Sequence, residues 1–392
     1  MKTLEKKNWG RKAVTIMVLV LLVILSAVNL KIVKVPLEKF IKKESDFEGF
    51  ADEIQKSYLS DSFDHKNDFV NVNGFFAKLT GRRVLNNVVK LNNGMLGRTL
   101  GHVDTVPLAN GISEFSDYLS EKDIPFLYIQ IPVKESLDGK SYPVGVNFYG
   151  NKNSDSILSQ LSACGVNTLD LRPFISQTSE MLEQYFSKTD HHWNSDGAFV
   201  AFQKILNRLN QSLPEANIDM TYAQADHWER HSLNNWFLGS LGKRVGNFFG
   251  GTDPLIWYTP VFETEMSFSV PEKAMFYRGD FSKANIRTMY IEDKDYFRYD
   301  AYCVYIGTNY SLGQHRNLNA PSPLKVLMIK DSFSLPLEAY LSTVFQEVDA
   351  LDPRAFTDCT FAEYVERAKP DIVILTMNPS VFVNEEYQNF GI

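Results

Sequence analysis

The stretch LKVLMI, Leu324 to Ile329, is a short apolar run of the kind that forms a buried strand, and a helix is expected from about Leu335. The pattern repeats downstream with EVDALD (Glu347 to Asp352), a helix near Phe361 to Ala368, and DIVILTM (Asp371 to Met377). Strands that alternate with helices form a parallel sheet with helices on both faces. This part of the chain therefore predicts an α/β fold.

The alternation extends upstream. FLYIQIPV (Phe126 to Val133) and VNTLDL (Val166 to Leu171) are candidate strands, separated by a helix around Asp155 to Ser162. Residues Ser195 to Leu213 carry apolar side chains at helical spacing, with Asp196 as a candidate N-terminal cap. The predicted sheet therefore draws strands from both halves of the chain.

Two segments fall outside this alternation. Residues 220–320 are rich in aromatic residues, Gly and Asn with weak periodicity, and we expect an irregular insertion of short strands and loops there. Residues 35–60 are charged and loosely amphipathic, which favours a short helical stalk. We therefore expect a tail and membrane anchor over 1–34, the stalk over 35–60, and one large domain over 61–392.

The anchor prediction rests on the uncharged stretch Ala13 to Leu30. At ~1.5 Å per residue it makes about 27 Å of helix, close to the thickness of a bilayer core. Five Lys or Arg residues and one Glu precede it, so the N-terminus is expected in the cytoplasm and the rest of the chain outside. A cleaved signal peptide and a buried core helix are the alternatives.

Composition excludes some classes of protein. The net charge of -7 and the pI of about 5.6 argue against a nucleic-acid partner, since such binding depends on Lys and Arg contacts to phosphates. Three widely spaced cysteines, Cys164, Cys303 and Cys359, cannot form a disulfide framework and suggest no zinc site, although one bridge would be compatible with them.

One segment with chemical potential is TDHHW, Thr189 to Trp193. In an extended segment, residues two apart point to the same face, so Asp190 would accept a hydrogen bond from a ring nitrogen of His192. Such a bond fixes the imidazole tautomer and stabilises the imidazolium ion. A surface loop with two histidines, and a metal site made by Asp190, His191 and His192, are the alternatives; we expect no metal.

The second segment is KDSFS, Lys330 to Ser334, directly after the predicted strand LKVLMI. Ser332 would lie at a strand-to-helix turn at the carboxyl edge of a parallel sheet, where α/β folds place their reactive groups. There the free N–H groups of the helix start favour a developing oxyanion. The alternative is that Asp331 or Ser332 only caps the helix.

A third segment, GHVDTVP (Gly101 to Pro107), resembles the part of zinc aminoacylase-type peptidases that carries their first metal-binding His. Such a site needs a Glu-Glu pair within the following tens of residues, and the pair Glu385-Glu386 lies far outside that spacing. We therefore expect a chance match in a loop, with no zinc at His102 or Asp104.

Taken together, YFSKTDHHWNSDGAF (Tyr185 to Phe199) and the later VLMIKDSF (Val326 to Phe333) resemble the DHHW family, which is similar to the alginate O-acetyltransferase proteins of the SGNH-like superfamily. The resemblance implies a three-layer α/β/α sandwich and a catalytic triad of Ser332 as nucleophile, His192 as general base and Asp190 as its orienting carboxylate. SGNH enzymes add a Gly and an Asn to the oxyanion hole. Gly307 and Asn378 are the nearest candidates.

The function implied is an extracytoplasmic O-acyltransferase, for O-acetyl groups, that modifies a polysaccharide through an acyl-serine and needs no cofactor. A multispanning membrane acyltransferase would be the partner that delivers the acyl group, because acyl-CoA is cytoplasmic. One alternative is a carbohydrate esterase with the same triad and water as acceptor. Another is a catalytically inactive carbohydrate-binding or assembly protein.

Overall fold

The computed structural model describes residues 30–44, 46, 48–53 and 65–392. The chain divides into two compact units, Met1–Val72 and Asn73–Ile392. The first unit contains α2 (Leu30–Ile41) and the start of α4 (Lys66–Leu79), with an ion pair of 2.9 Å between Lys39 and Glu53.

The predicted anchor, Ala13 to Leu30, lies outside the described residues except for Leu30, and so it stays a prediction. Within the described ranges, none of the helices has both the length and the apolar character needed to cross a bilayer. The division of the chain into tail, stalk and large domain also stays a prediction.

The second unit is built on an eight-stranded sheet. Its order is β5 (Thr168–Asp170), β4 (Phe126–Gln130), β13 (Ile372–Met377), β11 (Ser322–Ile329), β12 (Phe345–Leu351), β10 (Leu312–Asn317), β8 (Met266–Val270) and β9 (Met275–Gly279). The first five strands are parallel, and the last three pair antiparallel. The predicted mainly parallel sheet is thus confirmed. The last three strands, β10, β8 and β9, come from residues 220–320, where the apolar residues show little periodicity.

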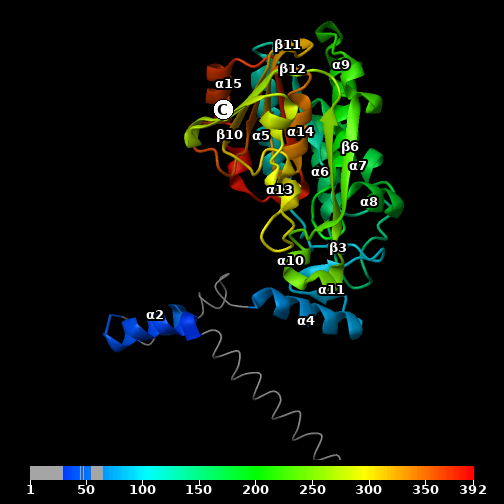
Figure 1. The fold of residues 1–392 in the computed structure, drawn as a ribbon. Coiled ribbons are helices and arrows are strands. Elements are labelled where there is room, and N and C mark those ends of the chain that lie inside the picture. Colours follow the sequence, from blue (N-terminus) through cyan, green and yellow to red (C-terminus); the bar gives the residue numbers. More distant parts are fainter. Residues whose placement is uncertain (1–29, 45, 47, 54–64) are drawn as a thin grey trace, which may run out of the picture. The chain divides into compact units, whose positions relative to one another are not determined.

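Helices cover both faces of this sheet (Figure 1). On β11, Leu327 and Ile329 join a core with α5 (Val106–Ser120), α6 (Gly150–Ala163) and α15 (Phe361–Ala368), whereas Val326 and Met328 join a core with α9 (Ser195–Ser212) and α14 (Leu335–Leu341). Successive strand residues point to opposite faces, so an all-apolar strand is what a sheet buried on both sides requires. Each fully buried Leu or Ile contributes roughly 1.5–3 kcal/mol.

The remaining elements lie outside the eight-stranded sheet. The strands are β1 (Val84–Leu85), β2 (Val88–Lys90) and β3 (Leu96–Gly97) in one small sheet and β6 (Trp228–Phe237) with β7 (Asp253–Pro260) in a ribbon. The helices are α7 (Arg172–Ile175), α8 (Ser179–Tyr185), α10 (Gly242–Val245), α11 (Asn247–Gly250), α12 (Phe281–Asn285) and α13 (Met289–Glu292). The 3-10 turns are η1 (Pro214–Ala216), η2 (Met220–Ala223), η3 (Ala225–His227), η4 (Pro271–Lys273), η5 (Ala301–Val304), η6 (Ser332–Ser334), η7 (Pro379–Val381) and η8 (Glu385–Gln388).

The start of α9 corrects one expectation. The cap is Asn194, whose side chain accepts a hydrogen bond of 3.0 Å from the Gly197 N–H. Asp196, expected as the cap, instead accepts hydrogen bonds from the Arg230 guanidinium and the Tyr258 hydroxyl. An Asn cap contributes about 1 kcal/mol. It also fixes the direction in which the chain leaves the TDHHW segment.

The three cysteines are free thiols. No disulfide therefore links Cys164, Cys303 and Cys359, and the sheet with its two helical layers is held by packing and hydrogen bonds.

Candidate active site

Ser332 lies at the carboxyl edge of the sheet, just after β11, as its position in the sequence predicted. The neighbouring Asp331 makes the helix cap, because its carboxylate accepts hydrogen bonds from the N–H groups of Phe333 (2.9 Å) and Asn378 (2.7 Å). The Ser332 side chain is therefore not needed as a cap. Its Oγ lies 2.8 Å from Nε2 of His192.

Asp190 completes a chain of hydrogen bonds. Its Oδ1 lies 2.6 Å from Nδ1 of His192 and also accepts the His192 backbone N–H at 2.9 Å, while Oδ2 accepts the Ser240 N–H at 2.6 Å. An ionised carboxylate only accepts hydrogen bonds, so Nδ1 of His192 carries the proton and Nε2 accepts the Ser332 O–H. The structure thus brings together the three residues that the two motifs predicted.

The electrostatics keep Asp190 ionised. Burial alone would raise its pKa, but the interactions with the His192 and His191 imidazoles and the hydrogen bonds from His192 and Ser240 hold the pKa well below its usual range. His191 differs: burial, with a smaller contribution from the charge of His192, lowers its pKa well below the usual value. His191 is therefore neutral at pH 7.

Aromatic rings fix the plane of the His192 imidazole. Tyr302 stacks on it with ring centroids 3.9 Å apart and 1° between the planes, and the His191 ring lies at 3.7 Å. The Tyr302 hydroxyl and the Trp193 indole N–H each donate to the Phe333 carbonyl oxygen at 2.8 Å. These bonds tie the TDHHW segment to the turn that carries Ser332.

Two buried charged residues hold the TDHHW loop from within. The Lys134 ammonium donates to the backbone carbonyl oxygens of Leu96, Ser187 and Asp190, and the Asp253 carboxylate accepts the N–H groups of Lys188 and Thr189. Burial lowers the pKa of Lys134 to about 8, although Asp253 and Asp190 oppose this, and burial raises the pKa of Asp253. Since the loop has little regular secondary structure, these residues supply the hydrogen bonds that its backbone would otherwise lack.

Gly239 allows the backbone to pass close to Asp190. A Cβ atom at this position would lie 2.4 Å from the Cβ and 2.5 Å from the backbone N of Asp190. Its own N–H donates to the Thr189 hydroxyl at 2.8 Å. Any side chain at 239 would therefore displace the carboxylate that orients His192.

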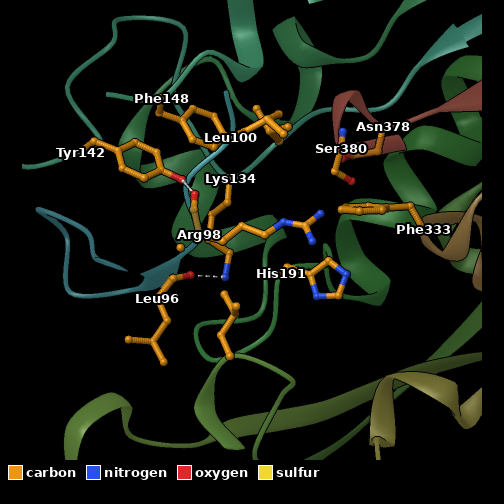
Figure 2. Close-up of a pocket in the computed structure, with 13 residues that line it drawn as sticks. Leu96, Arg98, Leu100, Lys134, Tyr142, Phe148, His191, Phe333, Asn378 and Ser380 are labelled. Atoms are coloured by element: carbon orange, nitrogen blue, oxygen red, sulfur yellow. Dashed lines mark hydrogen bonds between the residues drawn. The ribbon is translucent and has the colours of Figure 1, made fainter. Parts of the chain in front are cut away.

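A small pocket is lined in part by residues next to the triad in the chain (Figure 2). Its wall includes His191, which precedes His192 in the chain, and Phe333, which follows Ser332. The guanidinium of Arg98 extends between the His191 and Phe333 side chains toward Ser380. Burial lowers the pKa of Arg98. Within the described part of the chain, its guanidinium has neither a carboxylate partner nor a side-chain hydrogen bond. A cation without a directly paired carboxylate in such a pocket is suited to binding an anionic or carbonyl oxygen.

The two oxyanion candidates from the sequence differ in position. Asn378 lines this pocket, with Nδ2 donating to the Pro132 carbonyl oxygen at 2.9 Å. Gly307 does not line it, and its N–H is used by the carbonyl oxygens of Cys303 and Tyr305 at 3.1 and 2.7 Å. The structure therefore brings Asn378, and not Gly307, to the site. The backbone N–H of Ser332 has no acceptor within residues 65–392.

Two groups of residues were alternatives for a metal site, one in the TDHHW segment and one at His102 and Asp104. Possible ligand atoms of Asp190, His191 and His192 lie within 4.8 Å of one another. However, these side chains already bond each other, Ser240 and Ser332. His102 and Asp104 are exposed in a loop, where Asp104 accepts the Val106 N–H. The absence of a functional metal stays a prediction.

Several residues of the site were not predicted from the sequence. Lys134, Gly239, Asp253, Tyr302 and Arg98 lie far from both motifs in the chain, in segments with no chemical pattern of their own. The buried charge at Lys134 follows a strand, which was the one available signal.

Comparison with known proteins supports the fold. The model of the "SGNH hydrolase-like domain, acetyltransferase AlgX" matches residues 107–237, a range that contains Asp190 and His192 and ends before Ser332. Among curated proteins, none matches the sequence.

Solved structures resemble most of the chain. PatB1 of Bacillus cereus is 21% identical to this chain, with a TM-score of 0.64 over 77% of this chain and 99% of PatB1. A second PatB1 structure, which carries a sulfonyl adduct, has a TM-score of 0.63 at the same identity and coverage. A DHHW family protein from Eubacterium siraeum is 16% identical with a TM-score of 0.60, over 78% of this chain and 95% of that one. The SGNH-like α/β fold and the resemblance predicted from the two motifs are thus confirmed.

Proposed function

We propose that the chain is an extracytoplasmic O-acyltransferase that accepts an acetyl group on Ser332 and passes it to a hydroxyl group of a polysaccharide. The observation that carries this proposal is the continuous hydrogen-bonded chain Ser332–His192–Asp190. The match to an acetyltransferase family model supports the acetyl group. The predicted anchor supports the location, and a multispanning membrane acyltransferase is the proposed donor.

The chemistry follows from the atoms in place. His192 Nε2 takes the proton as Ser332 Oγ attacks the acyl carbonyl carbon, and the imidazolium returns this proton to the leaving group. In the second half, a sugar hydroxyl gives its proton to His192 and attacks the acyl-serine, and Ser332 leaves with that proton. The Ser332 N–H, the Asn378 amide and Arg98 are the donors near the position where negative charge develops.

Transfer, rather than hydrolysis, is favoured by the walls of the pocket. Much of the lining is apolar, from Leu96, Leu100, Val133, Phe148 and Phe333. Apolar walls hold water poorly, so an acyl-serine there would await a bound sugar hydroxyl. A carbohydrate esterase with the same three residues remains the alternative.

The partition of the acetyl group distinguishes the two functions. We expect the full chain, acetylated by an activated acetyl ester, to release acetate slowly in buffer and to transfer acetyl to added oligosaccharides rapidly. Mass spectrometry of the sugars and an assay of free acetate measure the two products. Release to water at the same rate with and without every sugar tested would instead identify an esterase.

Arg98 offers a second test. Replacing it with methionine should lower the rate of Ser332 acetylation by on the order of 10²-fold, because a donor to the oxyanion is lost. Arg98→Lys should restore part of the rate, since a cation remains, although without the planar fork. The rate constant is measured from the burst of released alcohol. If Arg98→Met raises only the KM for the sugar, Arg98 binds the acceptor and not the oxyanion.

A further inference from the structure

A cluster of large apolar side chains lies exposed on one side of α4. Phe75, Phe76 and Leu79 are 45%, 58% and 66% exposed, and Phe248 of α11 is 53% exposed. The ring of Phe75 lies 5.7 Å from that of Phe76 and 6.2 Å from that of Phe248. These four residues form a continuous apolar face, which we call the Phe face.

The opposite side of α4 shows that this exposure is not loose packing. Ala77 is buried, and a Cβ atom on Gly74 would lie 2.0 Å from the Val245 carbonyl oxygen of α10. The helix is thus pressed against α10 through its small residues, with the rings turned outward. Clustered exposed rings of this kind mark a site of interaction with a protein or a membrane.

The charges that follow the Phe face along the chain are of one sign, although the exposed Asp68 lies two turns earlier on α4. Lys78, Arg82, Arg83 and Arg244 are exposed around it. No Asp or Glu occurs between Asn73 and Val103, although the whole chain carries a net charge of -7. Burial, and then the positive charges of Lys78, Lys188 and Arg83, lower the pKa of Lys90. Positive charge is therefore concentrated at this end of an acidic protein.

We propose that the Phe face docks on an anionic lipid bilayer, with its rings and Leu79 in the interfacial layer and the four surrounding cations against lipid phosphates. Apolar side chains at the centre and Lys or Arg around them are the chemistry of an interfacial membrane contact. The four side chains are 45–66% exposed, so they can enter the interfacial layer without separating α4 from α10.

This docking would bring the small pocket that contains Arg98 close to the membrane. Leu96 and Leu241 line the pocket and also belong to the small core of Val245 and Phe249, on which α4 packs. A bilayer against the Phe face would therefore hold the pocket next to the membrane surface, where a membrane-embedded donor would act. The predicted span would only tether the domain, whereas this face would orient it.

Photocrosslinking of the full chain in vesicles tests the proposal. p-Benzoylphenylalanine replaces Phe76 or Phe248, and Phe276, which is 66% exposed on β9, serves as the matched control. In vesicles of phosphatidylcholine and phosphatidylglycerol, we expect phospholipid adducts at 76 and 248 and none at 276. Mass spectrometry identifies the adducts.

Reversing the charges near the Phe face provides a second test of docking. Each Lys or Arg near an anionic surface contributes about 1 kcal/mol, so Lys78→Glu, Arg82→Glu and Arg83→Glu together should weaken docking by at least ~100-fold. In this triple variant, the lipid adducts at positions 76 and 248 should fall to background, and so should the adducts of the native charge pattern in vesicles of pure phosphatidylcholine. The control Lys283→Glu, at an exposed lysine, should keep the adducts. Peptide adducts at 76 and 248, equal lipid adducts at 276, or no adducts in a folded chain would each overturn the proposal. Acetylation of Ser332 in detergent is measured separately, so failure of the proposed function is distinguishable.

Discussion

Ser332→Ala should abolish covalent labelling of the full chain by an activated acetyl ester or by a sulfonyl fluoride. Within residues 65–392, the Ser332 and Ser240 hydroxyls each lie 2.8 Å from an imidazole nitrogen, but only the Ser332 partner, His192, has its other ring nitrogen bonded to a carboxylate. A hydroxyl without such a base is a weak nucleophile at neutral pH. Intact mass spectrometry before and after peptide mapping measures the adduct.

Two other serines provide controls for this result. Ser380 lines the same pocket, and Ser334 is buried with its hydroxyl 2.8 Å from that of Thr376. Ser380→Ala and Ser334→Ala should keep the adduct on Ser332. Labelling of Ser332→Ala equal to that of the native chain would overturn the assignment of Ser332 as the nucleophile.

Asp190→Asn should lower the labelling rate by on the order of 10⁴-fold while the fold survives. The Asp190 carboxylate accepts three N–H groups, two from His192 and one from Ser240. An amide in its place must direct its NH₂ group at one of these donors, and the negative charge that stabilises the imidazolium is lost. Stopped-flow kinetics of label formation and thermal unfolding measure the two effects.

Asp196→Asn is the matched control for this change. Asp196 is bonded to Arg230 and Tyr258 outside the triad, so the rate should stay within a few-fold of the native value. The pH profile adds a further check. Because the pKa of Asp190 lies well below its usual range, its charge is kept as the pH falls to 5, and the acidic limb of the native profile must come from another group. A loss of rate equal in both Asn variants would assign Asp190 a purely structural role.

Much of the fold could be predicted because the parallel strands carry their own signal. β13 and the second half of β11, Val326 to Ile329, are nearly continuous apolar runs, and their burial on both faces requires that composition. The strands β8, β9 and β10 gave less signal. In β8 and β10 buried and less buried residues alternate over only five or six positions, in a segment crowded with aromatic residues.

The triad could be predicted from two local rules, whereas its support could not. Extended geometry places Asp190 beside His192, and the end of β11 places Ser332 at the edge of the sheet. Nothing local links Lys134 or Gly239 to the TDHHW loop, because their contacts form only when the chain folds. The cap of α9 was misassigned for a related reason: Asp196 found a stronger partner in Arg230.

The buried ammonium of Lys134 and the missing side chain at Gly239 mean that the motifs alone do not make an enzyme. A homologue with TDHHW and KDSF intact, but with an apolar residue at 134 or alanine at 239, would keep its sheet and its nucleophile. It would lose the backbone conformation that places the Asp190 carboxylate beside the His192 imidazole. It would thus become a pseudoenzyme through substitutions that lie outside both motifs. Among homologues that keep both motifs, those two positions would then separate active copies from inactive ones.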